Sequence, residues 1–106
     1  MMKVYIVMIS YLVPVERILE AAPAHRAYLE GYYAKEQILF SGMQASQKGG
    51  VIVMRASAET EVQALINQDP FSVQGLATYE IFTLNVRRYL PFVTDWLQGT
   101  SNEKVK

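Results

Sequence analysis

An apolar run near the N-terminus restricts the fold more than any other feature of this sequence. From Val4 to Ile9, successive residues are β-branched, aromatic or otherwise apolar. This composition predicts a β-strand over Lys3–Ser10. The run lacks the strict alternation of apolar and polar residues that marks a half-exposed strand, so both of its faces are expected to be buried. The fold must therefore cover two sides of a sheet.

Helix and strand signals alternate along the rest of the chain. Pro14 and Pro23 each suit the first position of a helix, where the missing N–H of proline costs no hydrogen bond. We therefore expect two separate helices, over residues 14–20 and 24–36, with a break at Pro23. Further strands are predicted over residues 38–44, 51–56 and 78–87, and a hairpin-type loop over residues 45–50 joins the first two of these.

The second long helix has a defined start and a defined stop. Ser57 is the expected N-cap residue, and Glu59 and Glu61 lie in the first turn, where the helix dipole favours negative charge. The helix must end before Pro70, because the residue that precedes a proline disfavours the helical conformation. The last segment, residues 98–106, is polar and is expected to form a flexible tail.

The resulting order of elements is β-α-β-β-α-β. This order predicts a ferredoxin-like α+β fold, in which a four-stranded antiparallel sheet carries both helices on one face. The chain has 106 residues, and two separate cores within that length would each be too small to be stable. We therefore expect a single domain over residues 1–106.

The second face of that sheet has no helix to cover it. The last strand is expected to place apolar side chains on both sides, namely Tyr79, Ile81 and Thr83 on one and Phe82, Leu84 and Val86 on the other. An exposed apolar face of that size is unusual in a soluble monomer, so we expect two copies of the chain to pack sheet against sheet as a homodimer. In the alternative, the apolar segment 89–97 folds back over the sheet.

Composition argues against several classes of function. Lys plus Arg and Asp plus Glu each number 10, and this balance disfavours nucleic-acid binding, as does the lack of stacking aromatics in the strand over residues 51–56. The chain has no cysteine and one histidine, which excludes disulfides and the usual multi-histidine zinc site within one chain. The N-terminal apolar run is too short to span a membrane, and no signal-peptide pattern follows it. We expect a cytoplasmic protein that binds neither membrane, metal nor nucleic acid.

The single histidine, His25, is the first candidate for chemistry. It shares one helix face with Tyr28, Leu29 and Tyr32. We expect it in the first turn of the helix over residues 24–36, where the dipole and burial both disfavour an imidazolium and leave a neutral ring that can act as a general base. The alternative is a structural histidine that makes one backbone hydrogen bond.

The second candidate is Asp69, at the end of the second long helix. The dipole opposes a carboxylate at a helix C-terminus, so its position calls for a reason. One interpretation is an ordinary turn before Pro70. In the other, Asp69 bonds one ring nitrogen of His25, fixes the tautomer and raises the basicity of the other nitrogen. The topology places both residues at the same end of the fold, but the sequence does not give their distance.

Four segments taken together resemble a known family. They are Pro23–Leu29 (PAHRAYL), Ile38–Gly42 (ILFSG), Asp69–Leu76 (DPFSVQGL) and Tyr79–Ile81 (YEI). These segments resemble the YCII-related (YciI-like) family of the dimeric α+β barrel superfamily, and the resemblance extends from Met2 to about Pro91. It implies a ferredoxin-like dimer with an active site on His25 and Asp69 that works without a cofactor.

Around that pair, we expect contacts to the substrate from Tyr5, Tyr28, Arg26, Ser41 and Phe71. The sequence also departs from the family pattern. Ala22 stands where the family often has an arginine, three residues before the histidine. Three readings stay open: Arg26 or Arg17 takes over that role, the substrate differs, or activity is lost.

The resemblance implies a small cofactor-independent enzyme. His25 and Asp69 would perform acid–base chemistry of a lyase, isomerase or dehydrochlorinase kind on a small cyclic or phenolic compound. One alternative is a non-catalytic ligand-binding or stress-associated module on the same dimeric scaffold. Another is a cofactor-free monooxygenase of the dimeric-barrel type, which rests on analogy of fold alone.

Overall fold

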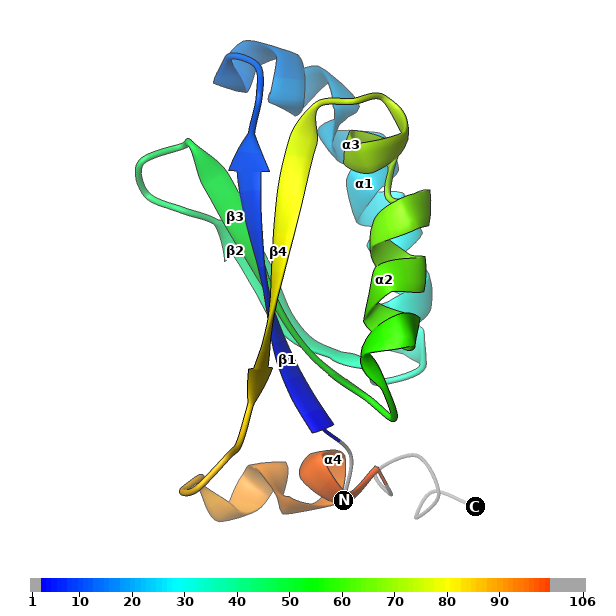
Figure 1. The fold of residues 1–106 in the computed structure, drawn as a ribbon, viewed down its shortest axis with the longest axis vertical. Helices are drawn as coiled ribbons and strands as arrows, with labels where there is room; N and C mark the ends of the chain where they lie inside the picture. The colour runs from blue at the N-terminus through cyan, green and yellow to red at the C-terminus, as the bar shows by residue number, and fades with distance from the viewer. Residues whose placement is uncertain (1–2, 100–106) are drawn as a thin grey trace.

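The computed structural model describes residues 3–99, which form one antiparallel sheet with helices against it (Figure 1). The strands are β1 (Lys3–Tyr11), β2 (Ile38–Met43), β3 (Gly49–Ala56) and β4 (Ala77–Leu84), in the order β2-β3-β1-β4. The long helices α1 (Val15–Ala34) and α2 (Glu59–Gln68) lie on the same face of this sheet. The predicted ferredoxin-like arrangement is therefore confirmed.

The core lies between the sheet and the two long helices. β1 is central and pairs antiparallel with β3 on one side and β4 on the other. Its residues Tyr5, Val7 and Ile9 face the helices and are almost completely buried. On the opposite face, Ile6 and Met8 are only half-buried within the single chain. The expectation that both faces of β1 are buried is thus met on the helix side, and on the opposite face only at Val4.

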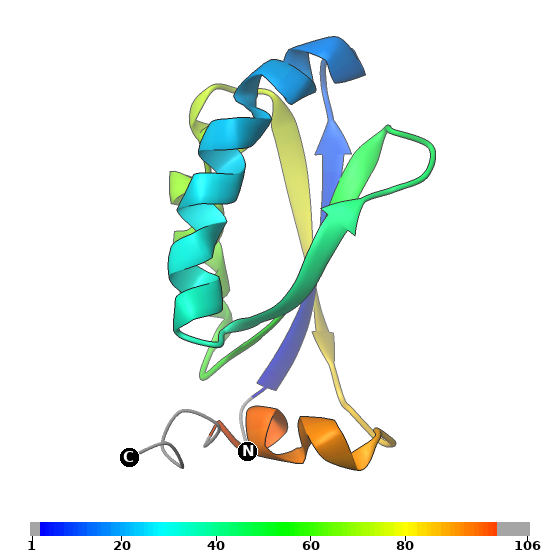
Figure 2. The same ribbon diagram turned by 180° about the vertical axis from the view of Figure 1, so that it is seen from behind.

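The predicted break at Pro23 is wrong, because α1 continues from Val15 to Ala34 through this proline. Pro23 has no N–H to donate to the carbonyl of Leu19. The Leu19 side of the helix is exposed, so solvent can hydrogen-bond that carbonyl instead. Figure 2 shows the first turns of α1 bent relative to the rest of the helix, which is the usual effect of an internal proline.

Several element boundaries differ from those predicted, and three of them have a clear cause. β3 begins at Gly49, inside the expected loop, because Gly49 and Gly50 pair with Ser10 and Ile9 of β1. The N-cap of α2 is Ala58 instead of Ser57, and the Glu61 carboxylate accepts the backbone N–H groups of both residues. β4 ends at Leu84, level with Val4 of β1, where its pairing stops.

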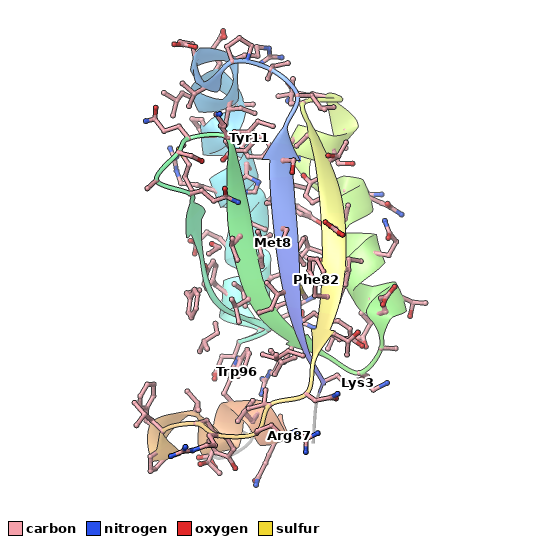
Figure 3. The ribbon with its side chains drawn as sticks, turned by 60° about the vertical axis from the view of Figure 1, so that its left-hand side comes forward. Lys3, Met8, Tyr11, Phe82, Arg87 and Trp96 are labelled. Carbon is pink, nitrogen blue, oxygen red and sulfur yellow. The ribbon has the colours of Figure 1, made fainter. Side chains whose placement is uncertain are left out.

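The C-terminal segment forms two short helices, a 3-10 helix η1 (Pro91–Val93) and α4 (Thr94–Gln98). Gln98 therefore belongs to a helix and not to the expected flexible tail. Residues 100–106 of that tail lie outside the described part of the chain. Trp96 and Leu97 of α4 pack on Val4, at one end of the sheet face opposite α1 and α2 (Figure 3). Segment 89–97 thus folds back on that end of the sheet.

Gly49 offers a test of the sheet, because a Cβ at this position would collide with the carbonyl oxygen of Ile9 in β1. We expect Gly49→Ala to force β1 and β3 apart and to lower the free energy of unfolding in urea by about 1–3 kcal/mol. Gly31→Ala is the control: in α1 no atom lies within 4 Å of the added Cβ. It should raise stability by about 0.5–1 kcal/mol through helix propensity. A Gly49→Ala protein as stable as the wild type would contradict this account of the pairing.

Candidate functional site

A cavity of about 420 Å³ lies between α1 and the sheet, toward β2 and β3. This volume falls in the range of small-molecule sites. The lining is mainly apolar and includes Ile9, Ile18, Leu29, Met43 and Ile52. Its polar and hydroxyl-bearing side chains are Tyr11, His25, Arg26, Glu30, Tyr33 and Ser41. The arrangement suits a small, mostly apolar molecule with a few polar substituents.

His25 and Asp69 are in direct contact, although they are far apart in the sequence. The His25 Nδ1 atom lies 2.7 Å from Asp69 Oδ1. An ionised carboxylate has no hydrogen to give, so the Nδ1–H group of the imidazole is the donor. In the neutral ring, Nε2 is then left as the hydrogen-bond acceptor. No residue of the described range 3–99 is hydrogen-bonded to Nε2, and His25 lines the cavity.

Three donors hold the Asp69 carboxylate, which is fully buried. Besides His25, the Tyr79 hydroxyl donates to Oδ2 at 2.7 Å, and the backbone N–H of Phe71 donates to Oδ1 at 3.2 Å. Asp69 follows the last residue of α2 and is also the N-cap residue of a short helix, α3 (Pro70–Val73). This unpredicted helix explains why an aspartate stands at the end of α2.

The imidazole is also fixed in orientation by an aromatic ring. The rings of His25 and Phe71 are stacked, with centroids 4.1 Å apart and planes inclined by 8°. Tyr11 packs edge-on against the same phenylalanine at 6.1 Å. Because Phe71 belongs to α3, the residues that orient the ring and its carboxylate partner come from one short segment.

One part of the sequence argument for His25 is wrong. His25 lies near the middle of α1, since the helix begins at Val15 and continues through Pro23. The dipole at a helix N-terminus therefore does not act on this ring. The side chain is 14% exposed, so it is buried on the Asp69 side and open toward the cavity.

The structure brings some of the other predicted site residues to the cavity and leaves others away from it. Arg26, Ser41 and Phe71 line the cavity. Tyr5 and Tyr28 do not: Tyr5 is 1% exposed in the core, and the Tyr28 hydroxyl donates to the backbone oxygen of Leu65 in α2 at 2.8 Å. Both point from their elements toward the α2 side of the core, so a ligand in this cavity would not touch them.

The two candidate replacements for the family arginine also differ in position. Ala22 itself lines the cavity, and so does the exposed Arg26. Arg17 does not line it and instead donates to the Gln74 side chain at 2.9 Å. Of the two arginines, only Arg26 borders the cavity where the family residue would stand.

Sequence reasoning missed two features of the site. Tyr79 was assigned only to a strand face, yet its hydroxyl holds Asp69. The Tyr33 hydroxyl lies 2.6 Å from Ser41 Oγ in the cavity wall. The alternation of β4 places Tyr79 on the helix side, but only the tertiary structure shows which residue meets it. Nothing in the sequence links Tyr33 to Ser41.

The family assignment follows from a match to a family model. The model of the YCII-related domain matches residues 2–85. The chain belongs to the YCII-related family. No curated protein sequence matches the chain.

Two solved structures have a similar fold. One is 5-chloro-2-hydroxyhydroquinone dehydrochlorinase, TftG, from Burkholderia phenoliruptrix AC1100, in complex with 2,5-dihydroxybenzoquinone. Its identity to this chain is 21%, with a TM-score of 0.66 over 78% of this chain and 95% of that one. The other is SnoaB, a cofactor-independent oxygenase from Streptomyces nogalater, with 10% identity and a TM-score of 0.51 over 85% of this chain and 97% of that one. At these identities the similarity shows a shared α+β fold.

Residues 3–99 offer neither a metal-binding cluster nor a membrane-spanning helix. Within this range, no group of three or more metal-ligating side chains is placed to hold an ion. None of the helices described there has the length and hydropathy to cross a bilayer. Location in the cytoplasm stays a prediction.

The contact between Tyr79 and Asp69 can be tested by measuring the stability of the protein as a function of pH. Burial, and then the hydrogen bond to Asp69, raise the pKa of Tyr79 well above that of a free tyrosine. Above about pH 10 the unfolded chain loses this phenolic proton while the folded chain keeps it. Tyr79 therefore makes wild-type stability fall by up to about 1.4 kcal/mol per pH unit in that range.

Urea unfolding of wild type and Tyr79→Phe from pH 7 upward measures this contribution. At pH 7 the variant should be less stable by about 1–3 kcal/mol, the usual cost of losing a hydrogen bond to a charged group. The difference should narrow as the pH rises above about 10, because phenylalanine does not ionise. Stability curves that stay parallel through this range would contradict the buried contact with Asp69.

Proposed function

We propose that this protein is a small enzyme in which His25 acts as a general base on a ring compound bound in the cavity. One observation carries the proposal: the His25–Asp69 contact of 2.7 Å lies in the wall of a 420 Å³ cavity, with Nε2 free of partners among the described residues. A histidine with a purely structural role needs neither a carboxylate at one ring nitrogen nor a cavity beside the other.

The proposed step is a proton transfer. Nε2 takes a proton from an O–H or C–H group of the substrate, whose bonding electrons remain on the substrate. The ring of His25 becomes an imidazolium, and the Asp69 carboxylate stabilises its charge. In a lyase-type reaction, the electrons expel a leaving group such as chloride from the substrate. In an isomerase-type reaction, His25 returns the proton to another atom.

The surroundings of the pair support this role. The carboxylate must stay in place while the ring changes charge, and the Tyr79 hydroxyl and the Phe71 N–H fix both of its oxygens. Stacking on Phe71 holds the plane of the imidazole. Because these groups are ordered before a ligand binds, little reorganisation is needed during proton transfer.

The lining of the cavity supports a small cyclic or phenolic substrate. Apolar side chains from α1 and the strands suit the faces of a ring, and the few polar groups suit its substituents. The shared fold with a dehydrochlorinase in complex with 2,5-dihydroxybenzoquinone fits the same class of compound. Arg26, at the exposed rim, is placed to attract an anionic substituent.

The test compares wild type with His25→Ala and Asp69→Asn, using 5-chloro-2-hydroxyhydroquinone as the first probe and chloride release as the readout. We expect His25→Ala to lower kcat by roughly 10²- to 10⁴-fold, the usual contribution of a general base. Asp69→Asn should lower kcat more than it raises KM, because it disturbs the tautomer of His25 and leaves the cavity lining unchanged.

Tyr32→Phe is a matched control, since it removes a hydroxyl from the same helix at a residue that does not line the cavity. It should leave turnover within about twofold of wild type. Wild type that binds ring compounds without converting any of them would support the non-catalytic alternative and overturn the proposal. Oxygen uptake that accompanies conversion would instead identify a cofactor-free monooxygenase.

We also propose that two copies of the chain pair through the sheet face opposite α1 and α2. Phe40, Phe82 and Leu84 are each about half exposed there, and Ile6, Met8, Val51 and Val53 lie between them (Figure 3). α4 covers only the end of this face near Val4. The row Phe40–Val53–Ile6–Phe82 is apolar across all four strands, with the exposed Glu80 beside it on β4, and it fits a second copy of the same surface.

Phe82→Asp tests the pairing, because it places a charge among the apolar side chains of this face, on the edge strand β4. We expect the wild type to sediment as a dimer at micromolar concentration. The dimer Kd of the variant should be at least tenfold higher. Leu19→Asp, at a similarly exposed residue of α1 outside this face, should not change the mass in solution. A monomeric wild type would overturn the proposed dimer.

A further inference from the structure

A pair of hydroxyl groups forms the end of the cavity away from His25. The Tyr33 hydroxyl of α1 and Ser41 Oγ of β2 are 2.6 Å apart, and both residues line the cavity. This contact joins the helix to an edge strand of the sheet. Both side chains are half-buried, so the pair is partly shielded from solvent.

The pair always has a donor to spare. Two hydroxyl groups carry two O–H donors, and the hydrogen bond between them uses one. No residue of the described range is hydrogen-bonded to the remaining O–H. Whichever oxygen donates within the pair, the other hydroxyl can donate to a ligand, and the bond between them strengthens that donor through polarisation.

The pair lies at a fixed offset from the base. Tyr33 follows His25 by eight residues in α1, which places their backbones about 12 Å apart along the axis and roughly 80° apart around it. Both side chains reach into one cavity, with apolar residues such as Leu29 and Ile52 between them. A single ring with polar substituents on opposite sides would meet an acceptor at one end and a donor at the other.

We propose that Tyr33 and Ser41 bind an oxygen substituent of the substrate ring and stabilise it as an oxyanion. This rests on the proposed function for the reaction, but binding of the oxyanion needs no turnover. When Nε2 removes a proton at the near end of a conjugated ring, the bonding electrons enter the ring and negative charge collects on the far oxygen. A hydrogen bond to that oxygen is stronger when it is charged, so it favours the ionised state.

The substrate class follows from this arrangement. It is a single conjugated ring with a proton-bearing group on one side and a hydroxyl or carbonyl oxygen on the other. A saturated ring of equal size would fill the cavity but would not carry charge from one end to the other. Tyr33 and Ser41 would thus determine specificity for conjugated oxygenated rings.

A chromophoric ligand, 4-nitrophenol, tests the oxyanion site because its phenolate absorbs at a different wavelength from the phenol. We expect wild type to bind the phenolate more tightly than the phenol, so the bound ligand ionises at lower pH than the free one. The double variant Tyr33→Phe/Ser41→Ala, which has neither hydroxyl, should weaken phenolate binding by about tenfold or more, the loss expected for a hydrogen bond to a charged group. The affinity for 4-nitroanisole, which cannot ionise, should differ less than threefold between this variant and wild type.

Two further variants keep the test decisive. Ser41→Thr retains the hydroxyl and should keep most of the phenolate affinity, so it separates loss of the donor from damage to the fold. Tyr32→Phe should bind like wild type, because Tyr32 does not line the cavity. Absence of phenolate preference in wild type, or its persistence in the double variant Tyr33→Phe/Ser41→Ala, would overturn this inference.

The test of the oxyanion site and the test of the proposed function can give different results. If the His25→Ala variant loses turnover while the double variant Tyr33→Phe/Ser41→Ala binds phenolate as wild type does, the base is supported and the oxyanion site fails. If phenolate preference depends on Tyr33 and Ser41 but no conjugated ring is converted, the oxyanion site stands and the catalytic proposal fails.

Discussion

The buried carboxylate of Asp69 imposes the strictest requirement on this structure. Removing such a group from water costs several kcal/mol unless donors replace the lost hydration. At 0% exposure, Asp69 meets this requirement with His25 from α1, Phe71 from α3 and Tyr79 from β4. Donors from three elements, of which α1 is distant in sequence from Asp69, must converge on two oxygen atoms. The packing of α1 against the end of α2 and against β4 is therefore fixed by a polar contact as well as by apolar burial.

The same requirement prepares the site for chemistry. The donors that satisfy the carboxylate also set the tautomer of His25 and leave its second nitrogen toward the cavity. Burial holds the Tyr79 phenol in its protonated, donating form by raising its pKa. A stable fold and an oriented base thus depend on one set of hydrogen bonds. Substitution of Asp69 is expected to affect both, which is why changes in kcat and in stability must be measured together.

Much of the fold could be predicted from the sequence, since it depends on local patterns. The apolar run in β1 and the order of elements were sufficient for the sheet and its topology. The break at Pro23 was wrong because tertiary packing keeps α1 continuous and the exposed side of the helix tolerates a missing hydrogen bond. The short helix α3 was missed because four residues carry no periodicity.

The candidate site was predictable only where sequence chemistry was unusual. A lone histidine and an aspartate at a helix end both called for an explanation, and the family resemblance paired them. Tyr33 and Ser41 gave no such signal, because a tyrosine in a helix and a serine in a strand are ordinary residues. Their contact depends on the angle at which α1 crosses β2, and that angle is set by the packing of the whole core.

The two ends of the cavity differ in what they offer a ligand. The His25 end presents a hydrogen-bond acceptor, and the Tyr33–Ser41 end presents a donor, with apolar side chains between them. A molecule that merely fills the space satisfies neither end, and leaving a buried polar group unpaired costs about 1–3 kcal/mol. A molecule that satisfies both ends must carry a donor and an acceptor on opposite sides. If a conjugated ring joins them, loss of the proton at one end strengthens the hydrogen bond at the other. Binding and proton transfer then favour the same ligands.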